Sequence, residues 1–305
     1  MYLRVVYTRL RSMIAVAAFT FCWPAVAAAQ SDPPPPPKVR VYYRDVLAAR
    51  VNPLGLINDF RVSVRRRILE PGGALTKETF VGVGTSLVLS PAFFRYGPFV
   101  EVQPLSILTL AAGVEAQGYF RTFSQLQSFP TATAAYDDET LSKNAERDEH
   151  YATTATVAFL EARLQFKVGP VAARSAMRAL HTAVTATEGD VAYYDQILDI
   201  LVPRDGWLVT NDADVLVLPN QNWIFGVRHT FTHSFLPEPA TANETHRLGP
   251  LIGYRFFDTP YAMFNQPTLN LLAQWWLVHP YRTGAKQPTA LPLIALAFSF
   301  NGDFL

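Results

Sequence analysis

The last residues of the chain alternate between two kinds of side chain. Large apolar residues share one face, and small or polar residues share the other. The apolar set is Ile294, Leu296, Phe298, Phe300 and Phe304, and the second set is Ala295, Ala297, Ser299, Asn301 and Asp303. Because successive side chains of a β-strand point to opposite faces, this pattern predicts one strand between an apolar and a polar environment.

Residues 292–305 resemble the closing strand of bacterial outer-membrane β-barrels, which normally ends on an aromatic residue. In this chain Leu305 follows Phe304, so the aromatic residue is the penultimate one. The resemblance implies a Gram-negative outer-membrane protein surrounded by membrane lipid and lipopolysaccharide. It also implies that the barrel-assembly machinery recognises this strand, and it indicates no specific family within the class.

The first 30 residues carry the pattern of a secretory signal peptide. Three arginines precede an apolar run over 13–23, and an Ala-rich stretch at 25–29 supplies small residues for cleavage. A membrane-spanning helix is the alternative, but Pro24 ends the run short of the roughly 20 apolar residues that a span needs. The only cysteine, Cys22, lies in this segment, so we expect no disulfide in the mature chain.

Removal of residues 1–30 takes three basic and no acidic residues from the chain. The balance changes from 26 basic and 25 acidic residues to 23 and 25, which gives no electrostatic support for nucleic-acid binding. The hydrophobic share is 50%, yet no second uninterrupted apolar run of about 18 residues follows. The composition therefore excludes a helical membrane protein, and residues 39–305 are expected to form one large β domain.

Residues 31–38 include five consecutive prolines and predict an extended linker, because proline favours the polyproline II conformation and lacks a ladder donor. A ligand for a proline-reading domain is the alternative. The next segment, 39–47, fits either a first strand or a periplasmic lead-in.

The mature chain contains a series of two-faced segments separated by turn residues. Each is close to the length of a tilted membrane strand, and Pro104 indicates either a turn or a bulge between two of them. The expected fold is an all-β, transmembrane, antiparallel up-and-down β-barrel of ten to twelve strands, with both termini in the periplasm. The segments are 58–68, 78–90, 98–104, 107–120, 154–168, 171–183, 207–218, 222–236, 247–257, 267–281 and 288–304.

The connections alternate in length as this topology requires. Short turns are expected at 168–171 and 218–222 on the periplasmic side, and long loops outside the cell. The long loops are 121–152, 184–206, 237–246 and 282–290. Within 184–206, Tyr194, Ile197, Leu198 and Leu201 recur at helical spacing, which predicts either a short amphipathic helix that gates the barrel or a packed surface loop.

Two sets of residues are candidates for contact with the membrane and with the barrel interior. Trp207, Trp223 and Tyr281 are expected to form an aromatic girdle, although aromatic residues are common on any strand. The face opposite the apolar one carries nine basic and four acidic residues, expected either to pair or to hold water and favour anions. These lumen-lining residues are Arg61, Arg65, Arg67, Glu115, Glu161, Arg163, Lys167, Arg174, Arg178, Asp212, Asp214, Arg228 and Arg255.

The sequence predicts no catalytic, metal or cofactor site. His229 and His233 share a strand face, but about 13 Å separates them at ~3.3 Å per residue, too far for one metal ion. No hydrolase, metalloprotease or phosphate-loop motif is present. Convergence of His181 with Asp195, Asp199 and Asp205 at the outer mouth is an alternative that turn chemistry explains more simply.

Three functions fit these observations. The first is a passive, porin-like channel or transport protein for small, preferably anionic, solutes. The second is a closed structural or adhesive barrel whose long loops bind a surface partner, and the third is a soluble secreted β-sandwich. The sequence does not set the oligomeric state.

Overall fold

The computed structural model describes residues 36–240, 243–283 and 291–304. The predicted signal peptide, residues 1–30, lies outside the described residues, as does most of the predicted linker at 31–38.

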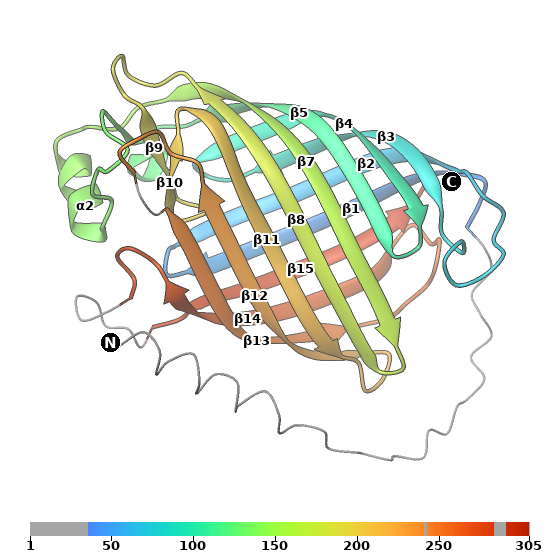
Figure 1. Cartoon of the computed structure of the whole chain (residues 1–305). Coiled ribbons are helices and arrows are strands. Elements are labelled where there is room, and N and C mark those ends of the chain that lie inside the picture. Colours follow the sequence, from blue (N-terminus) through green and yellow to red (C-terminus); the bar gives the residue numbers. More distant parts are fainter. Residues whose placement is uncertain (1–35, 241–242, 284–290, 305) are drawn as a thin grey trace, which may run out of the picture. The chain divides into compact units, whose positions relative to one another are not determined.

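Twelve antiparallel strands close into one barrel (Figure 1). The ring closes where β1 pairs with β15, in a register that runs from Tyr42 opposite Asp303 to Val51 opposite Ile294. This is the predicted all-β, up-and-down barrel, with the largest strand number of the predicted range. The strands are β1 (Val39–Val51), β2 (Gly55–Arg67), β3 (Phe80–Leu89), β4 (Phe93–Leu105), β5 (Leu108–Tyr119), β7 (Thr153–Val168), β8 (Val171–Val184), β11 (Asp205–Val217), β12 (Trp223–Ser234), β13 (Glu244–Arg255), β14 (Asn265–Val278) and β15 (Leu293–Asp303).

The structure settles two points that the sequence left open. Residues 39–47 belong to β1, the first strand of the barrel. Pro104 lies inside β4, close to its end, where the register with β5 shifts between Val102 and Leu105. Proline has no amide hydrogen, so this irregular strand end is a position where it removes no regular ladder bond.

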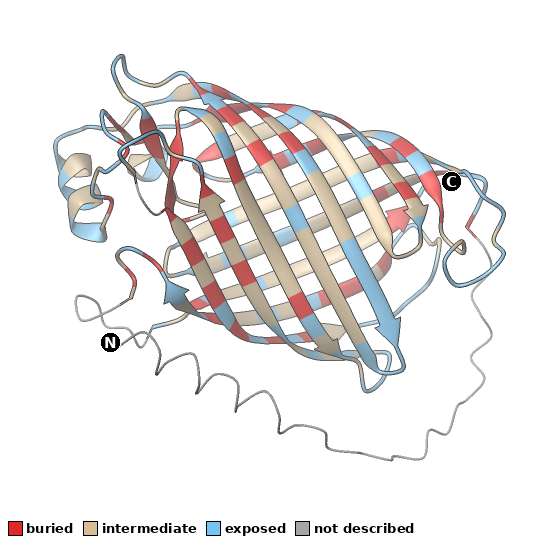
Figure 2. Cartoon of the chain, viewed as in Figure 1, coloured by how far each residue is buried: buried red, intermediate tan, exposed pale blue. Residues whose placement is uncertain are grey.

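The barrel wall has two faces, and the outer one is apolar. Buried and exposed residues alternate along the strands (Figure 2). Every barrel strand contributes at least one exposed large hydrophobic residue to the outer face. Examples in chain order are Leu47, Val64, Val83, Val100, Val114, Leu160, Met177, Val215, Val227, Ile252, Leu271 and Leu296. An apolar belt around a closed barrel is the surface that a lipid bilayer covers. Among the described residues, no helix is long and apolar enough to cross a bilayer.

The two ends of the barrel differ. The start of β1 and the end of β15 lie at one end, the terminus end, together with the short turns 169–170 and 218–222. The three longest connections, 120–152, 185–204 and 279–292, lie at the opposite end, the loop end, together with 235–243. The predicted long loops and short turns are therefore at the expected ends, but the alternation is not strict, because 68–79 at the terminus end is longer than 235–243 and the turns 52–54 and 90–92 at the loop end are short.

A small second sheet lies at the loop end. It consists of β6 (Ser128–Phe129), β9 (Ala192–Asp195) and β10 (Ile200–Pro203), and β9 and β10 form a hairpin over 192–203. The helix considered for this segment is therefore wrong. Tyr194 pairs with Leu201 across the hairpin, and β9 also pairs with β6, so tertiary strand pairing overrides the helical spacing of the apolar residues.

One helix lies in the acidic stretch of the 120–152 connection. α2 (Asp138–Glu146) begins after Asp137, whose side chain accepts a hydrogen bond from the amide of Thr140 at 3.0 Å. Asp138 and Glu139 occupy its first turn, where negative charge complements the helix dipole. The three acidic residues at the start of this helix are therefore explained by helix capping and by the helix dipole.

Candidate functional site

The candidate functional site is the barrel interior together with its mouth at the loop end. Apolar residues of the hairpin 192–203 pack into one cluster with inward-facing residues of the barrel wall. Tyr193, Ile200 and Val202 are the hairpin's buried members, and Phe93 and Val157 are examples from the wall. The hairpin therefore covers the mouth, and apolar burial holds it there.

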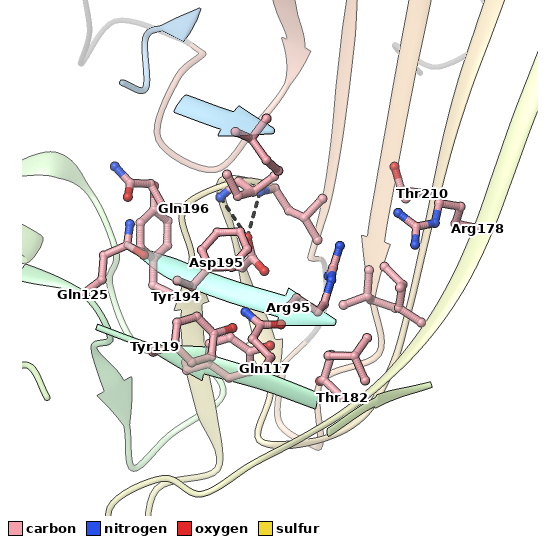
Figure 3. Close-up of a pocket in the computed structure, with 18 residues that line it drawn as sticks. Arg95, Gln117, Tyr119, Gln125, Arg178, Thr182, Tyr194, Asp195, Gln196 and Thr210 are labelled. Atoms are coloured by element: carbon pink, nitrogen blue, oxygen red, sulfur yellow. Dashed lines mark hydrogen bonds between the residues drawn. The ribbon is translucent and has the colours of Figure 1, made fainter. Parts of the chain in front are cut away.

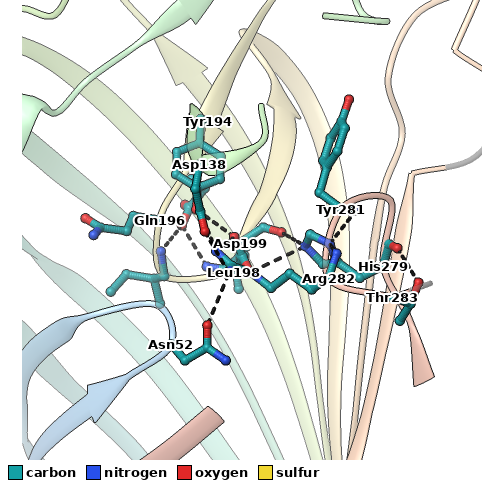
Figure 4. Close-up of polar contacts among 12 residues, drawn as sticks. Asn52, Asp138, Tyr194, Gln196, Leu198, Asp199, His279, Tyr281, Arg282 and Thr283 are labelled. Carbon is teal, nitrogen blue, oxygen red and sulfur yellow. Dashed lines mark hydrogen bonds and ion pairs between the residues drawn. The ribbon is translucent and has the colours of Figure 1, made fainter. Parts of the chain in front are cut away.

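A buried polar cluster fastens the hairpin to the connection that follows β14 (Figure 4). Arg282 donates to Asp199 through Nε and Nη2, the latter at 3.2 Å from Oδ1, and His279 Nε2 lies 2.9 Å from the Asp199 carbonyl oxygen. The side chains of these three residues are at most 7% exposed. Tyr194 donates to Asp199 Oδ1 at 2.6 Å. We call Asp199, His279 and Arg282 the latch.

The geometry of the latch also sets the state of its histidine. His279 Nδ1 accepts hydrogen bonds from the amides of Tyr281 and Arg282, at 3.0 and 2.9 Å. Its Nε2 therefore carries the hydrogen and donates to Asp199, as in the neutral ring. Arg282 in turn donates to Asn52 in the β1–β2 turn and to Asp138 at the start of α2, each at 3.2 Å. The latch thus joins four segments that are distant in sequence.

The hairpin tip has a second anchor on β1. Arg50 donates to the carbonyl oxygens of Gln196 and Ile197, the latter at 2.7 Å, and Gln196 donates to the Leu54 carbonyl at 3.1 Å. The Asp195 side chain accepts from the amides of Ile197 and Leu198 and so fixes the turn. Backbone groups that would otherwise be unpaired are satisfied within the mouth.

The pKa of Asp199 predicts how the latch responds to acid. Burial acts to raise this pKa, but the hydrogen bonds from His279 and Arg282 and the positive charge of Arg282 outweigh it and hold the pKa well below its ordinary value of 3.8. A carboxyl with a depressed pKa contributes stability that is complete above its ordinary pKa and is lost as the pH falls through the depressed one. The mouth should therefore stay closed at pH 5 and loosen only in strong acid.

Spin labels at positions 54 and 196 would report this. Cysteines can be introduced there cleanly, because the only native one, Cys22, lies in the predicted signal peptide. We expect the same short label distance at pH 7 and pH 5, and a broad distribution near pH 3 and below. Broadening between pH 7 and pH 5 would contradict the role assigned to Asp199.

Below the mouth, ion pairs cross the interior of the barrel. Arg61 on β2 contacts Glu161 on β7 at 3.2 Å, although these strands are not neighbours, so the pair spans the interior. Glu161 also contacts Arg163 at 2.7 Å and Arg178 at 3.5 Å. Asp59 extends this network, with contacts to Arg61 at 3.6 Å and to Arg44 at 3.3 Å. Arg95 and Glu115 form a further pair at 2.9 Å beside it.

A second cluster of ion pairs lies inside the barrel, on β8, β11 and β12. Asp214 contacts Arg228 at 2.7 Å and also pairs with Arg174, and Arg228 is 3.6 Å from Asp212. These four residues balance in charge.

A glycine allows one of the interior pairs to bridge two strands that are not adjacent. Arg65 on β2 and Glu101 on β4 are 2.7 Å apart across β3. Gly82 of β3 lies between them, and a Cβ there would be 3.1 Å from the Glu101 carboxylate and 3.2 Å from Arg65 Cγ. A side chain at this position would crowd the pair.

The thirteen residues assigned to the lumen divide into two groups. Ten face inward and take part in the pairs described above. Three lie at the rim of the terminus end: Arg67 pairs with Glu70, Arg255 pairs with Asp258, and Lys167 is exposed where β7 extends beyond the last residue pair with β5. The barrel interior therefore lies on the loop-end side of these three residues.

Several interior charges were missed by the sequence analysis, and some of them lie on segments that were not recognised as strands. They are Arg40, Arg44, Arg50, Asp59, Arg95, Glu101, Arg247 and Asp303. The first three lie on β1, and Arg95 lies on the part of β4 before residue 98. Asp59 shares the parity of Arg61, so the alternation rule does identify it.

The three girdle candidates lie in different places. Trp207 and Trp223 are exposed on the outer wall, near the loop end of β11 and the terminus end of β12, respectively. Tyr281 is instead part of the cover at the loop end, where its ring packs against Tyr136 at a centroid distance of 4.7 Å. Tyr281 is therefore not part of a girdle, which corrects the prediction, because the residue follows the end of β14 and turns inward with the latch.

The histidines and aspartates considered for catalysis do not converge. His181 pairs with Asp205 at 3.5 Å, whereas Asp199 is buried in the latch and Asp195 caps the hairpin turn. His229 contacts His246 across β12 and β13 at 3.1 Å, a pairing that the sequence did not predict. No group of three potential metal ligands occurs among the described residues.

No protein-family model and no curated protein match the chain. OmpT, an outer membrane protein of Vibrio cholerae, is 6% identical with a TM-score of 0.35, over 87% of this chain and 97% of that chain. The translocator domain of autotransporter NalP from Neisseria meningitidis is 11% identical with a TM-score of 0.34, over 87% and 88%. Pseudomonas aeruginosa OprD is 10% identical with a TM-score of 0.29, over 88% and 95%. At these scores the likeness carries no argument about the site.

Proposed function

We propose that this protein is a Gram-negative outer-membrane channel for small anionic solutes, closed at its outer mouth by the hairpin 192–203. In this orientation the loop end faces outside and the terminus end faces the periplasm. Export by residues 1–30, insertion through the C-terminal strand by the barrel-assembly machinery, and a surrounding layer of lipid and lipopolysaccharide belong to the same proposal.

One observation carries the proposal. The ion-pair network beneath the mouth contains more arginines than carboxylates, because Arg44, Arg61, Arg95, Arg163 and Arg178 face only Asp59, Glu115 and Glu161. Fixed positive charge in a hydrated pore favours anions. Toward the terminus end, the side chains of Arg174 and Asp212 are 38% and 40% exposed, which supports a wet interior there.

The obstruction at the outer end comes from a loop, and a loop can move without breaking the barrel. The hairpin joins the wall through apolar packing, the latch and Arg50, whereas each wall strand is bonded to two neighbours. Elements with fewer backbone bonds to the rest of the fold open at lower free energy. The hairpin is therefore the gate in this proposal.

Removal of the gate should raise conductance. A variant in which residues 194–201 are replaced by two glycines is expected to give open channels in planar bilayers, whereas the wild type opens rarely. Under a tenfold KCl gradient, the reversal potential should have the sign of chloride selectivity. Lys143→Ala, in the exposed Glu139–Lys143 pair of α2, serves as the control and should conduct like the wild type. If neither the folded wild type nor the folded variant without the hairpin conducts, the channel function is refuted.

A closed structural or adhesive barrel is the second candidate. The Arg61–Glu161 pair spans the interior, and the hairpin has its own buried apolar residues, both of which suit a barrel that never opens. In that case deletion of 124–149 should abolish binding to a surface partner, while the protein keeps its heat-modifiable migration on gels. Unchanged binding would count against this function.

A further inference from the structure

A cavity of about 100 Å³ lies beneath the tip of the hairpin, inside the barrel (Figure 3). Its lid is the tip itself, residues 195–198, and its polar wall includes Arg95, Gln117, Arg178 and Thr210. A buried water needs roughly 10–15 Å³, so the cavity has room for several waters or for one small polyatomic ion.

Two guanidinium groups in this wall have unused donors. The ion pair of Arg95 with Glu115 is made through Nε, at 2.9 Å, and that of Arg178 with Glu161 is made through Nε, at 3.5 Å. Among the described residues, no hydrogen bond reaches the terminal nitrogens of either side chain, and Arg178 Nη2 is buried without a partner. The two side chains are 17% and 23% exposed, and both line the cavity. A guanidinium has five N–H donors, so most of these are free to bind a ligand.

Two neutral side chains of the cavity wall, Gln117 and Thr210, offer further hydrogen-bond donors. Gln117 has a side-chain amide that makes no hydrogen bond with another described residue, and it is buried at the cavity wall. Thr210 accepts from Thr232 at 3.5 Å, which leaves its own hydroxyl hydrogen available. Thr182 also lines the cavity, but it already donates to the Pro203 carbonyl.

The charge around the cavity is unbalanced. The network next to it has five arginines and three carboxylates, and Asp195 of the lid adds a fourth negative charge. One positive charge then remains without a counter-charge. An uncompensated charge of this kind in a poorly hydrated interior is unfavourable, and a bound monovalent anion would offset it.

We propose that this cavity is a binding site for a small monovalent oxyanion, a carboxylate or a phosphate, held between Arg95 and Arg178 with Gln117 and Thr210 as neutral donors. Planar guanidinium groups favour such ligands because two N–H groups can meet two oxygens of one anion. The site deepens the proposed channel function by giving the chemistry of its solute, and it rests on that function only for the route by which the anion arrives.

Calorimetric titration of the folded mature protein in detergent micelles tests the site directly. Inorganic phosphate and acetate are titrated at constant ionic strength, with chloride as the anion that lacks two oxygens. We expect saturable binding of one phosphate or acetate per chain and no comparable binding of chloride. Arg178→Gln should weaken the oxyanion at least about tenfold, because a charge-assisted pair of hydrogen bonds is lost. Arg66→Gln, the same substitution at an exposed position on β2, is the control and should bind like the wild type.

The outcomes separate the site from the channel. Equal binding of chloride, no saturable oxyanion binding by the wild type, or unchanged binding by Arg178→Gln would overturn the site. If Arg178→Gln fails to fold, Arg178→Lys and Thr210→Val test it instead, since each keeps the local charge and removes donors; both should bind more weakly. If the protein binds an oxyanion but never conducts, the channel is refuted and the binding site stands. If it conducts but binds no oxyanion, the binding site is refuted and the channel stands.

Discussion

Asp199→Asn is expected to release the hairpin from the barrel mouth. The substitution removes the charge that faces Arg282 in a site where both side chains are nearly inaccessible. Loss of one partner of a buried ion pair costs roughly 3–5 kcal/mol, because the other charge stays buried without compensation. Asp138 still contacts Arg282 at 3.2 Å, so we expect a cost near the lower end of this range.

Hydrogen exchange of the backbone amides in 192–203 measures this effect locally. A cost of about 3 kcal/mol should speed their exchange roughly hundredfold, while amides in the wall strands keep their protection. Asp205→Asn, the same chemical change at an exposed carboxylate just after the hairpin, should leave exchange unchanged. Exchange within a factor of two of the wild type in Asp199→Asn would show that the latch does not hold the hairpin.

The barrel wall could be predicted from sequence because its determinants are local. In a strand with lipid on one side and charge on the other, a period of two gives the direction of every side chain. The closing strand, Leu293–Asp303, established this pattern, and the same parity identifies Arg61, Glu161 and Arg178 as interior residues. Arg95 was missed because the extent of its strand was underestimated, whereas Asp59 and Glu101 were missed within recognised segments.

The closed mouth could not be predicted in the same way. The latch brings together Asp199, His279 and Arg282 from two connections, and no period in the sequence relates them. Helical spacing within 194–201 was misleading because strand pairing between β9 and β10 decides the structure there. The gate and the cavity beneath it depend on long-range contacts, and these determine whether an Arg-rich interior is open or covered.

Glu161 is the central carboxylate of the interior network. It is the shared partner of Arg61, Arg163 and Arg178, and its side chain is largely buried. Glu161→Gln keeps the shape of the side chain and removes its charge, so three arginines lose their common counter-ion. We expect this variant to lower the free energy of unfolding by about 3–5 kcal/mol, since each remaining charge must find water or another partner. Urea unfolding in micelles measures this, with exposed Glu139→Gln as the unchanged control.

The same substitution should also raise anion preference, because the network gains one unit of positive charge relative to its carboxylates. In the variant without the hairpin, Glu161→Gln should shift the reversal potential further toward that of chloride. The loss of one carboxylate would then lower the free energy of unfolding and raise the anion preference of the pore. Lower stability with an unchanged reversal potential would mean that Glu161 only supports the wall, and the closed-barrel function would then be favoured.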